Sequence, residues 1–177
     1  GGLAPGAVVM SWRGTEGGIE AMKQGHDVIM TPGRYCYLDH AQDAPFREPE
    51  SIGGYLPLDS VYVYEPVEAR MPQDRIHHIL GLQANLWSEY IPDDAHAEYM
   101  YWPRAFAIAE TAWSAPERKN LQDFRRRALN MLELMKRRGY NVFDLSNEYG
   151  ERKLAQTGLE HKAKGKPVKY LKPVQQW

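Results

Sequence analysis

Short apolar runs flank an amphipathic stretch in the first part of the chain. Residues 7–12, AVVMSW, form a nearly continuous apolar run, which is typical of a strand covered on both faces. Residues 15–24 follow a helical pattern, with Thr15 as a possible N-cap and Gly25 as the stop. Residues 28–30, VIM, form the next apolar run. This order predicts a βαβ unit with parallel strands and a right-handed crossover.

The middle of the chain predicts a long loop followed by a third strand. Residues 40–57 hold several prolines, glycines and charges, and a loop this long inside a compact domain is often functional. Residues 58–64 fit either a short strand or a helical turn. Residues 79–87, ILGLQANLW, predict a third buried strand, which ends shortly before a turn near Pro92.

The last part of the chain predicts helices and then loses its pattern. Residues 94–113 predict a helix in which Pro103 places a kink or a new start. Residues 120–138 predict a clearer amphipathic helix, and its apolar stripe indicates core packing. The pattern weakens from residue 141 onward. The lysine-rich residues 160–172 fit a solvated linker better than an anion-binding tail.

Composition and charge narrow the classes of function. The chain has 22 Lys and Arg against 23 Asp and Glu, and this balance argues against a nucleic-acid surface, which needs a basic excess. No apolar run approaches the length that crosses a bilayer, and no signal-peptide pattern is present. The single Cys36 cannot form an internal disulfide, so cysteine usage does not indicate the compartment. A strand so close to a first residue Gly1 suggests a chain cut from something longer.

The sequence gives little support to metal, nucleotide or nucleophile chemistry. The histidines show no ligand spacing, and the adjacent His77 and His78 would point to opposite sides of an extended segment. Residues 14–18 contain glycines without a phosphate-loop pattern, and no nucleophile elbow occurs. Cys36 lies in an apolar stretch that favours a buried structural thiol. We therefore expect no metal and no cofactor.

Aromatic and acidic side chains occur where the predicted strands end. They are Trp12, then Tyr37 and Asp39, then Trp87 and Glu89. Parallel strands place their carboxyl ends on one face, which holds the site in barrels and in open α/β sheets. Aromatic faces pack against pyranose rings, and carboxylates accept hydrogen bonds from hydroxyls. The set predicts a sugar pocket, although each residue alone also fits a core, rim, capping or surface ion-pair role.

These segments resemble the C-terminal part of a glycoside hydrolase family 20 catalytic domain, the β-N-acetylhexosaminidases. The resemblance covers about residues 7–114. It rests on motifs in order: VVMSWRG at 8–14, GHDVIMTP at 25–32, YLD at 37–39, GG at 53–54, VYVYEP at 61–66, GLQANLWSE at 81–89 and WPR at 102–104.

The resemblance implies a fold and a division of the chain. The fold is α/β, a partial (β/α)8 barrel of about the last three βα units plus C-terminal helices. Residues 1–140 would be the C-terminal part of the barrel domain. Residues 141–177 would be an extended tail or a linker toward a missing domain.

The resemblance also implies roles for the five residues. Tyr37 would be catalytic, because it would donate to the acetamido oxygen of the substrate and support the intermediate. Asp39 and Glu89 would hold hydroxyls of the terminal sugar, and Trp12 and Trp87 would wall the pocket. The substrate assists its own hydrolysis in this family. The family's catalytic Asp-Glu pair is missing, since no Asp-Glu dipeptide occurs in the chain, and no Trp stands between positions 39 and 81 to serve the aglycone side.

The sequence thus predicts a fragment of an exo-β-N-acetylhexosaminidase that acts on terminal N-acetylglucosamine or N-acetylgalactosamine of glycans and is inactive alone. Analogy with the family suggests that the parent protein is exported. The alternative is a non-catalytic carbohydrate-binding or scaffold domain, complete in itself. Three strands of a parallel barrel leave open edges and an uncovered apolar face. A fragment should therefore self-associate or be marginally stable, whereas a complete domain should be a stable monomer.

Overall fold

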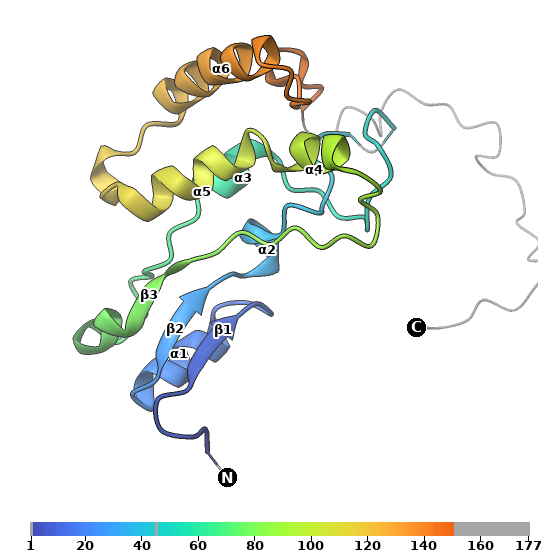
Figure 1. The fold of residues 1–177 in the computed structure, drawn as a ribbon. Helices are drawn as coiled ribbons and strands as arrows, with labels where there is room; N and C mark the ends of the chain where they lie inside the picture. Colours follow the sequence, from blue (N-terminus) through green and yellow to red (C-terminus); the bar gives the residue numbers. More distant parts are fainter. Residues whose placement is uncertain (1, 45, 151–177) are drawn as a thin grey trace, which may run out of the picture.

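The computed structural model describes residues 2–44 and 46–150, which form a parallel sheet with helices beside it (Figure 1). The strands are β1 (Val8–Ser11), β2 (Asp27–Met30) and β3 (Ile79–Leu82). They lie in the order β1-β2-β3, and both neighbouring pairs are parallel. The expected three parallel strands are therefore present in chain order, as in a segment of a (β/α)8 barrel.

Helix α1 (Glu16–Lys23) makes the crossover between β1 and β2, as the sequence predicts. Thr15 is its N-cap residue, but the Thr15 side chain makes no capping hydrogen bond and instead accepts one from Arg70 Nη2 at 2.6 Å. Gly25 follows the helix with a φ of 80°, a conformation that glycine adopts without strain. The apolar face of α1 packs on β2 through Met22 and Met30.

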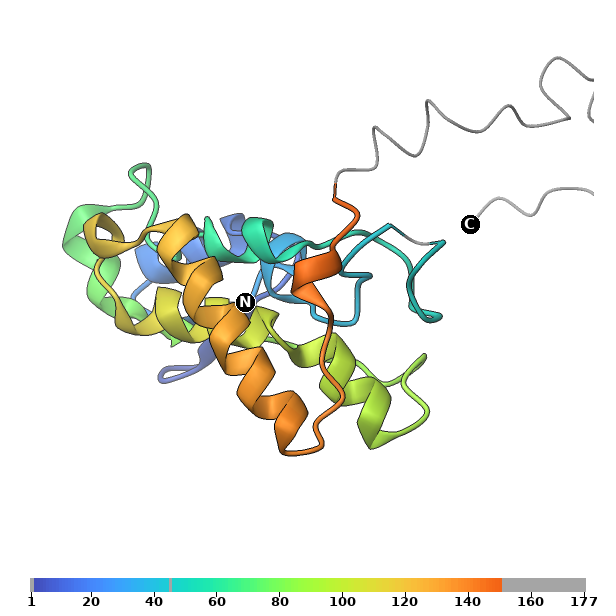
Figure 2. The same ribbon diagram turned by 90° about the horizontal axis from the view of Figure 1, so that it is seen from above.

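The other helices follow β2 and β3. They are α2 (Gly33–Cys36), α3 (Leu58–Tyr62), α4 (Asp94–Tyr101), α5 (Arg104–Trp113) and α6 (Leu121–Arg137), with 3-10 turns η1 (Gln73–His78), η2 (Pro116–Arg118) and η3 (Leu145–Asn147). The ambiguous stretch after the long loop is thus helical. Pro103 separates α4 from α5, so the predicted new start is confirmed. Figures 1 and 2 show α6 lying beside the pair formed by α3 and α5.

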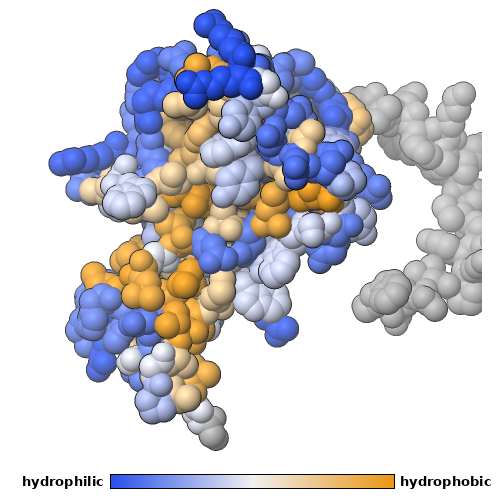
Figure 3. Space-filling model, viewed as in Figure 1, coloured by the Kyte–Doolittle hydropathy of each residue, from blue (hydrophilic) through white to orange (hydrophobic). Residues whose placement is uncertain are grey.

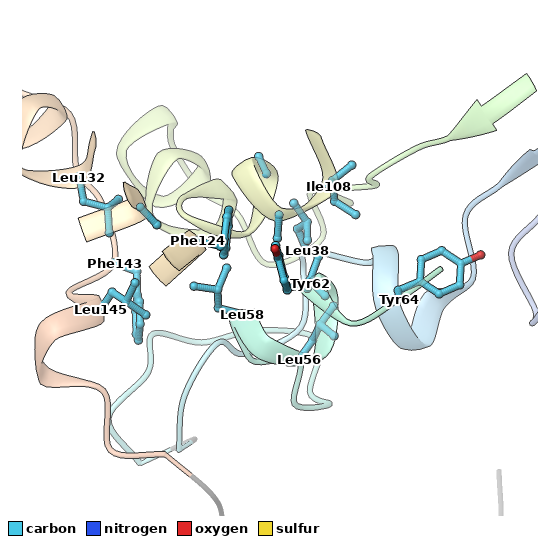
Figure 4. Packing of buried hydrophobic residues seen from close by; sticks show 14 of the residues in the cluster. Leu38, Leu56, Leu58, Tyr62, Tyr64, Ile108, Phe124, Leu132, Phe143 and Leu145 are labelled. Atoms are coloured by element: carbon cyan, nitrogen blue, oxygen red, sulfur yellow. The ribbon is translucent and has the colours of Figure 1, made fainter. Parts of the chain in front are cut away.

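The larger hydrophobic cluster lies among these helices rather than under the sheet. Figure 4 shows side chains of α3, α5 and α6 meeting there. The rings of Tyr62 and Phe124 stack with centroids 4.4 Å apart. Val142, Phe143 and Leu145 are buried in the same cluster. Packing therefore continues past residue 140, where the sequence suggests the start of a tail. Residues 151–177 of that expected tail lie outside the described residues.

The predicted burial of the first and third strands is wrong. Val8 and Met10 on β1 and Leu80 on β3 are exposed, and Figure 3 shows apolar surface over the strands. The third strand also ends at Leu82, five residues before its predicted end at Trp87. Within the described residues β1 pairs with β2 alone, so one of its edges has no strand partner. The apolar runs are present, but the described residues do not supply the elements that would cover them.

Candidate active site

A pocket of about 900 Å³ opens where the three strands end. This volume lies within the range of small-molecule sites, roughly 300–1,000 Å³. All five residues singled out in the sequence line it, namely Trp12, Tyr37, Asp39, Trp87 and Glu89. The structure thus brings together side chains that follow three different strands around one hollow.

Alternate residues of an extended segment supply one whole wall of this pocket. Gln83, Asn85, Trp87 and Glu89 all line it. Successive side chains of extended backbone point to opposite sides, so residues two apart share a side. On the neighbouring segment, Tyr37 and Asp39 also line the pocket, but a turn at Leu38 and Asp39 places the carboxylate there. The sequence predicts a buried strand at residues 79–87 without a role for Gln83 or Asn85, although both lie at steps of two before Glu89.

Backbone hydrogen bonds hold the segments that carry these side chains. Tyr37 and Asn85 form an isolated parallel bridge beyond the sheet. In it, the Leu38 N–H donates to the Asn85 carbonyl at 2.7 Å, and the Asn85 N–H donates to the Cys36 carbonyl at 2.8 Å. The Gly33 N–H donates to the Trp12 carbonyl at 2.9 Å. The loops after β1 and β2 are therefore fixed to each other, and the loop after β2 is fixed to the segment after β3.

Polar side chains between these segments are joined by hydrogen bonds. The Asn85 side-chain amide donates to Thr31 Oγ1, and Gln83 Nε2 donates to Asn85 Oδ1 at 2.8 Å. All three residues line the pocket. This network links Thr31, which follows β2, to Asn85, which follows β3.

The two indoles lie at the rim rather than in the core. Trp12 is 48% exposed and Trp87 is 52% exposed, which excludes a core role for either in the described structure. The Arg13 guanidinium lies over the Trp12 ring, 4.7 Å from its centroid. Half-exposed aromatic faces beside polar groups are suited to stacking on a ligand that is apolar on one face and polar at its edge.

Asp39 is the most unusual polar group in the pocket. It is only 5% exposed, and its Oδ1 has no hydrogen-bond partner in the part of the chain that the structure describes. Burial is the main cause that raises the pKa of Asp39, and the nearby Glu89 carboxylate adds to the rise. Glu89 is exposed and forms no ion pair within the described residues. Buried polar atoms are normally hydrogen-bonded, so a free carboxylate oxygen in a pocket wall is suited to accept from a ligand hydroxyl.

Arg104 holds the backbone on both sides of Asp39. Its side chain is fully buried; Nη1 donates to the carbonyls of His40 at 2.8 Å and Leu56 at 3.0 Å, and Nη2 donates to those of Leu38 and Met100. Burial lowers the pKa of Arg104, but the guanidinium stays charged at neutral pH. Arg104 appears in the sequence within a motif, without an assigned role, because its partners lie up to 66 positions away.

The long loop at residues 40–57 supplies another part of the pocket wall through His40 and Ile52. The His40 ring lies against Gly54, where an added Cβ would be 2.8 Å from His40 Cγ. Gly54 also has a φ of 71°, which favours glycine. Burial is the main cause that lowers the pKa of His40, which favours a neutral imidazole in the pocket. His40 and Ile52 were not predicted as site residues, since a single His or Ile in a loop carries no pattern.

The chain is also similar to known proteins in sequence and in fold. The sequence profile of the glycosyl hydrolase family 20 catalytic domain matches residues 2–116. The chain belongs to glycosyl hydrolase family 20. A beta-hexosaminidase from Porphyromonas gingivalis is 48% identical over 142 residues, which are 80% of this chain and 18% of the relative. One from Vibrio furnissii is 38% identical over 104 residues, 58% of this chain and 17% of the relative. The chain therefore spans less than a fifth of the length of these two relatives.

Solved structures of family 20 enzymes show the same fold. The exo beta-N-acetylglucosaminidase from Vibrio harveyi, in complex with N-acetylglucosamine, has a TM-score of 0.68 and 34% identity, covering 77% of this chain and 22% of that chain. The Streptomyces coelicolor beta-N-acetylhexosaminidase has a TM-score of 0.70 at 22% identity, covering 84% of this chain and 31% of that one, and shows the fold alone. The predicted family is confirmed, and so is the fold class, a partial (β/α)8 barrel in this family 20 chain.

Metal-ligand groups and membrane-spanning helices are both absent from the described residues. Among residues 2–44 and 46–150, no group of three or more His, Cys, Asp or Glu side chains is placed to hold a metal ion. No helix in that part of the chain is both long and apolar enough to cross a membrane.

Proposed function

We propose that this chain is the C-terminal part of the catalytic domain of an exo-β-N-acetylhexosaminidase. The substrates are glycans that end in N-acetylglucosamine or N-acetylgalactosamine. The observation that carries the proposal is the gathering of Trp12, Tyr37, Asp39, Trp87 and Glu89 around one pocket. The names of the similar proteins support it, because they are beta-hexosaminidases.

Each of the five residues takes the role that the family resemblance implies, and the chemistry of its side chain suits that role. Trp12 and Trp87 stack on the faces of the sugar, and Asp39 and Glu89 accept hydrogen bonds from its hydroxyls. Tyr37 donates its phenolic hydrogen bond to the acetamido oxygen of the substrate. That oxygen attacks the anomeric carbon as the glycosidic bond breaks, an oxazolinium ion forms, and water then opens it with net retention.

The acid that protonates the leaving oxygen has to come from outside this chain. In the family the Glu of an Asp-Glu pair does this work while the Asp before it orients the acetamido group, and no Asp-Glu dipeptide occurs in the sequence. We therefore propose that the chain alone binds part of the sugar but does not hydrolyse it, and that a longer protein carrying this chain is the enzyme.

An assay of two proteins tests this function. The chain alone and the full-length protein that carries it are incubated with an aryl β-N-acetylglucosaminide. We expect turnover by the full-length protein and none by the chain alone. An aryl β-glucoside is the control substrate, because it lacks the acetamido group and should not be hydrolysed. Turnover by the pure chain would contradict the placement of the chemistry outside it.

The unpaired edge of the sheet distinguishes two hypotheses. A fragment of an enzyme should have such an edge, whereas a complete sugar-binding or scaffold domain should not. β1 has one edge without a strand partner in the described structure, and Val8, Met10 and Leu80 are exposed. Such an edge pairs readily with another chain. We propose that the purified chain self-associates, or pairs with the rest of the barrel when that is supplied. Light scattering over a concentration series tests this, and a stable monomer that binds sugar would favour the rival.

A further inference from the structure

After α6, residues 147–150 (the returning segment) contact the long loop at residues 40–57, which lines the pocket. Asp43, in that loop, is only 2% exposed, and its carboxylate accepts hydrogen bonds from the backbone N–H groups of Tyr149 at 2.7 Å and Gly150 at 3.0 Å. A buried carboxylate is costly unless it is hydrogen-bonded. Arg47 Nη1 lies 4.0 Å from the same carboxylate, at the limit of an ion pair. The two amide groups of the returning segment therefore supply the close contacts that Asp43 needs.

The same short segment also contacts the far end of the loop. The Tyr55 hydroxyl donates to the Gly150 carbonyl at 3.3 Å. Gly150 thus contacts both ends of the loop, through its N–H at Asp43 and through its carbonyl at Tyr55. Gly150 has a φ of 85°, which favours glycine, so this double contact uses a backbone shape that other residues rarely adopt.

Contacts along the loop strengthen its attachment to the segment. Arg47 Nη1 donates to the Asn147 carbonyl at 3.1 Å. The Phe46 ring packs edge-on against the Tyr149 ring, with centroids 5.1 Å apart. The segment is itself held to α6, because Arg125 Nη2 contacts Glu148 Oε2 at 2.6 Å. A rigid helix therefore supports the far side of the attachment.

The two ends of the loop lead directly to the pocket. Ala41 and Tyr55 form an isolated parallel bridge, in which the Leu56 N–H donates to the Ala41 carbonyl at 2.9 Å. The neighbours of these two residues are His40 and Gly54, which lie against each other at the pocket wall. A shift at Tyr55 would move Gly54 and hence the His40 imidazole.

We propose that residues 147–150 are a clamp, and that Asp43 and Tyr55 are positioning residues that set the pocket wall formed by His40 and Ile52. The proposal rests on the proposed function, because its effect is on the affinity for substrate. The family profile matches only residues 2–116, so a segment beyond that match shapes the sugar pocket.

The test uses Tyr55→Phe and Asp43→Asn in the full-length protein, with Tyr140→Phe as the matched control at an exposed tyrosine. Kinetic constants with the aryl β-N-acetylglucosaminide and hydrogen exchange of residues 40–57 are measured. We expect Tyr55→Phe to raise KM about three- to tenfold, the effect of one lost hydrogen bond, with kcat within about twofold of wild type. Asp43→Asn, which keeps one acceptor oxygen, should raise KM at least as much. Both should speed exchange in the loop, and Tyr140→Phe should change neither quantity.

The outcomes separate the clamp from a purely structural role. Faster exchange with an unchanged KM would overturn the proposal, because the segment would then stabilise the loop without shaping the pocket. Unchanged exchange in both variants would overturn it as well. If the wild-type protein shows no turnover, the proposed function fails, and exchange of residues 40–57 alone decides whether the segment holds the loop.

Discussion

Tyr37 and Asn85 are paired in a parallel bridge beyond the last residues of β2 and β3. The bridge lies outside the register of the sheet, because helix α2 (Gly33–Cys36) intervenes between Met30 and Tyr37 while only two residues separate Leu82 from Asn85. Residues two positions further along are Asp39 and Trp87, and Glu89 follows at the same spacing. This pairing holds the two segments side by side, and the phenol, the indole and the two carboxylates, which lie in the turns at Asp39 and Glu89, line the same pocket.

Replacing Arg104 should destabilise the fold strongly. In Arg104→Leu, four carbonyl groups lose their donors, and a buried polar group left without a partner typically costs about 1–3 kcal/mol. Arg104→Lys should also destabilise, because one ammonium group cannot reproduce the planar fork. Urea unfolding of the chain measures the change. Arg126→Ala, at an exposed ion pair with Asp123, is the control and should stay within about 0.5 kcal/mol.

Asp39→Asn should stabilise the fold at neutral pH. Burial raises the folded-state pKa of Asp39 above its unfolded value of about 3.9. The stabilisation that comes from the proton is complete below that unfolded value and is lost as the pH rises through the folded-state pKa. An Asn does not ionise, so the free energy of unfolding of the variant should exceed that of wild type at pH 7, and the gap should close toward pH 4.

Urea unfolding at a series of pH values measures that gap. Glu117→Gln, at an exposed carboxylate of η2, is the control and should show no comparable gap. A wild-type chain that is more stable than Asp39→Asn at pH 7 would show that the fold stabilises this carboxylate instead. Under the proposed function the same variant should bind sugar more weakly, because the amide offers one acceptor oxygen in place of two.

Gly54→Ala tests the contact between the Gly54 backbone and the His40 ring. The substitution adds backbone strain at a φ of 71° and places a Cβ within 2.8 Å of the imidazole ring. Gly139→Ala is the matched control, because Gly139 has a φ of 87° with open space around it. Strain alone costs of order 1–3 kcal/mol. Thermal unfolding should show a larger loss for Gly54→Ala, and equal losses would mean that His40 moves aside without cost.

The longer helices could be predicted from the sequence because their signals are local, whereas α2 was not predicted and residues 58–64 fit either a strand or a helical turn. The expected helix at residues 120–138 is found as Leu121–Arg137, with the predicted start at Asn120, whose side chain accepts from the Asp123 N–H. The burial of β1 and β3 could not be predicted, since it depends on which elements cover Val8 and Leu80. The early end of β3 depends on pairing with β2, which no single segment encodes.

The site was predictable where residue type and strand position coincide, as for Trp12 and Trp87. Gln83 and Asn85 share the same spacing and could have been found with the period of two. Arg104, Asp43 and His40 could not, because their contacts join segments far apart in the chain. Their importance appears only when the loop, α5 and the returning segment are placed together.

The catalytic role of Tyr37 is the central claim, and Tyr37→Phe in the full-length protein tests it most directly. Loss of a hydrogen-bond donor aimed at the transition state typically lowers kcat by about 100- to 1,000-fold. We predict a fall of that size with the aryl β-N-acetylglucosaminide, an unchanged melting temperature, and wild-type kinetics for Tyr140→Phe. A kcat for Tyr37→Phe equal to that of wild type would contradict the account.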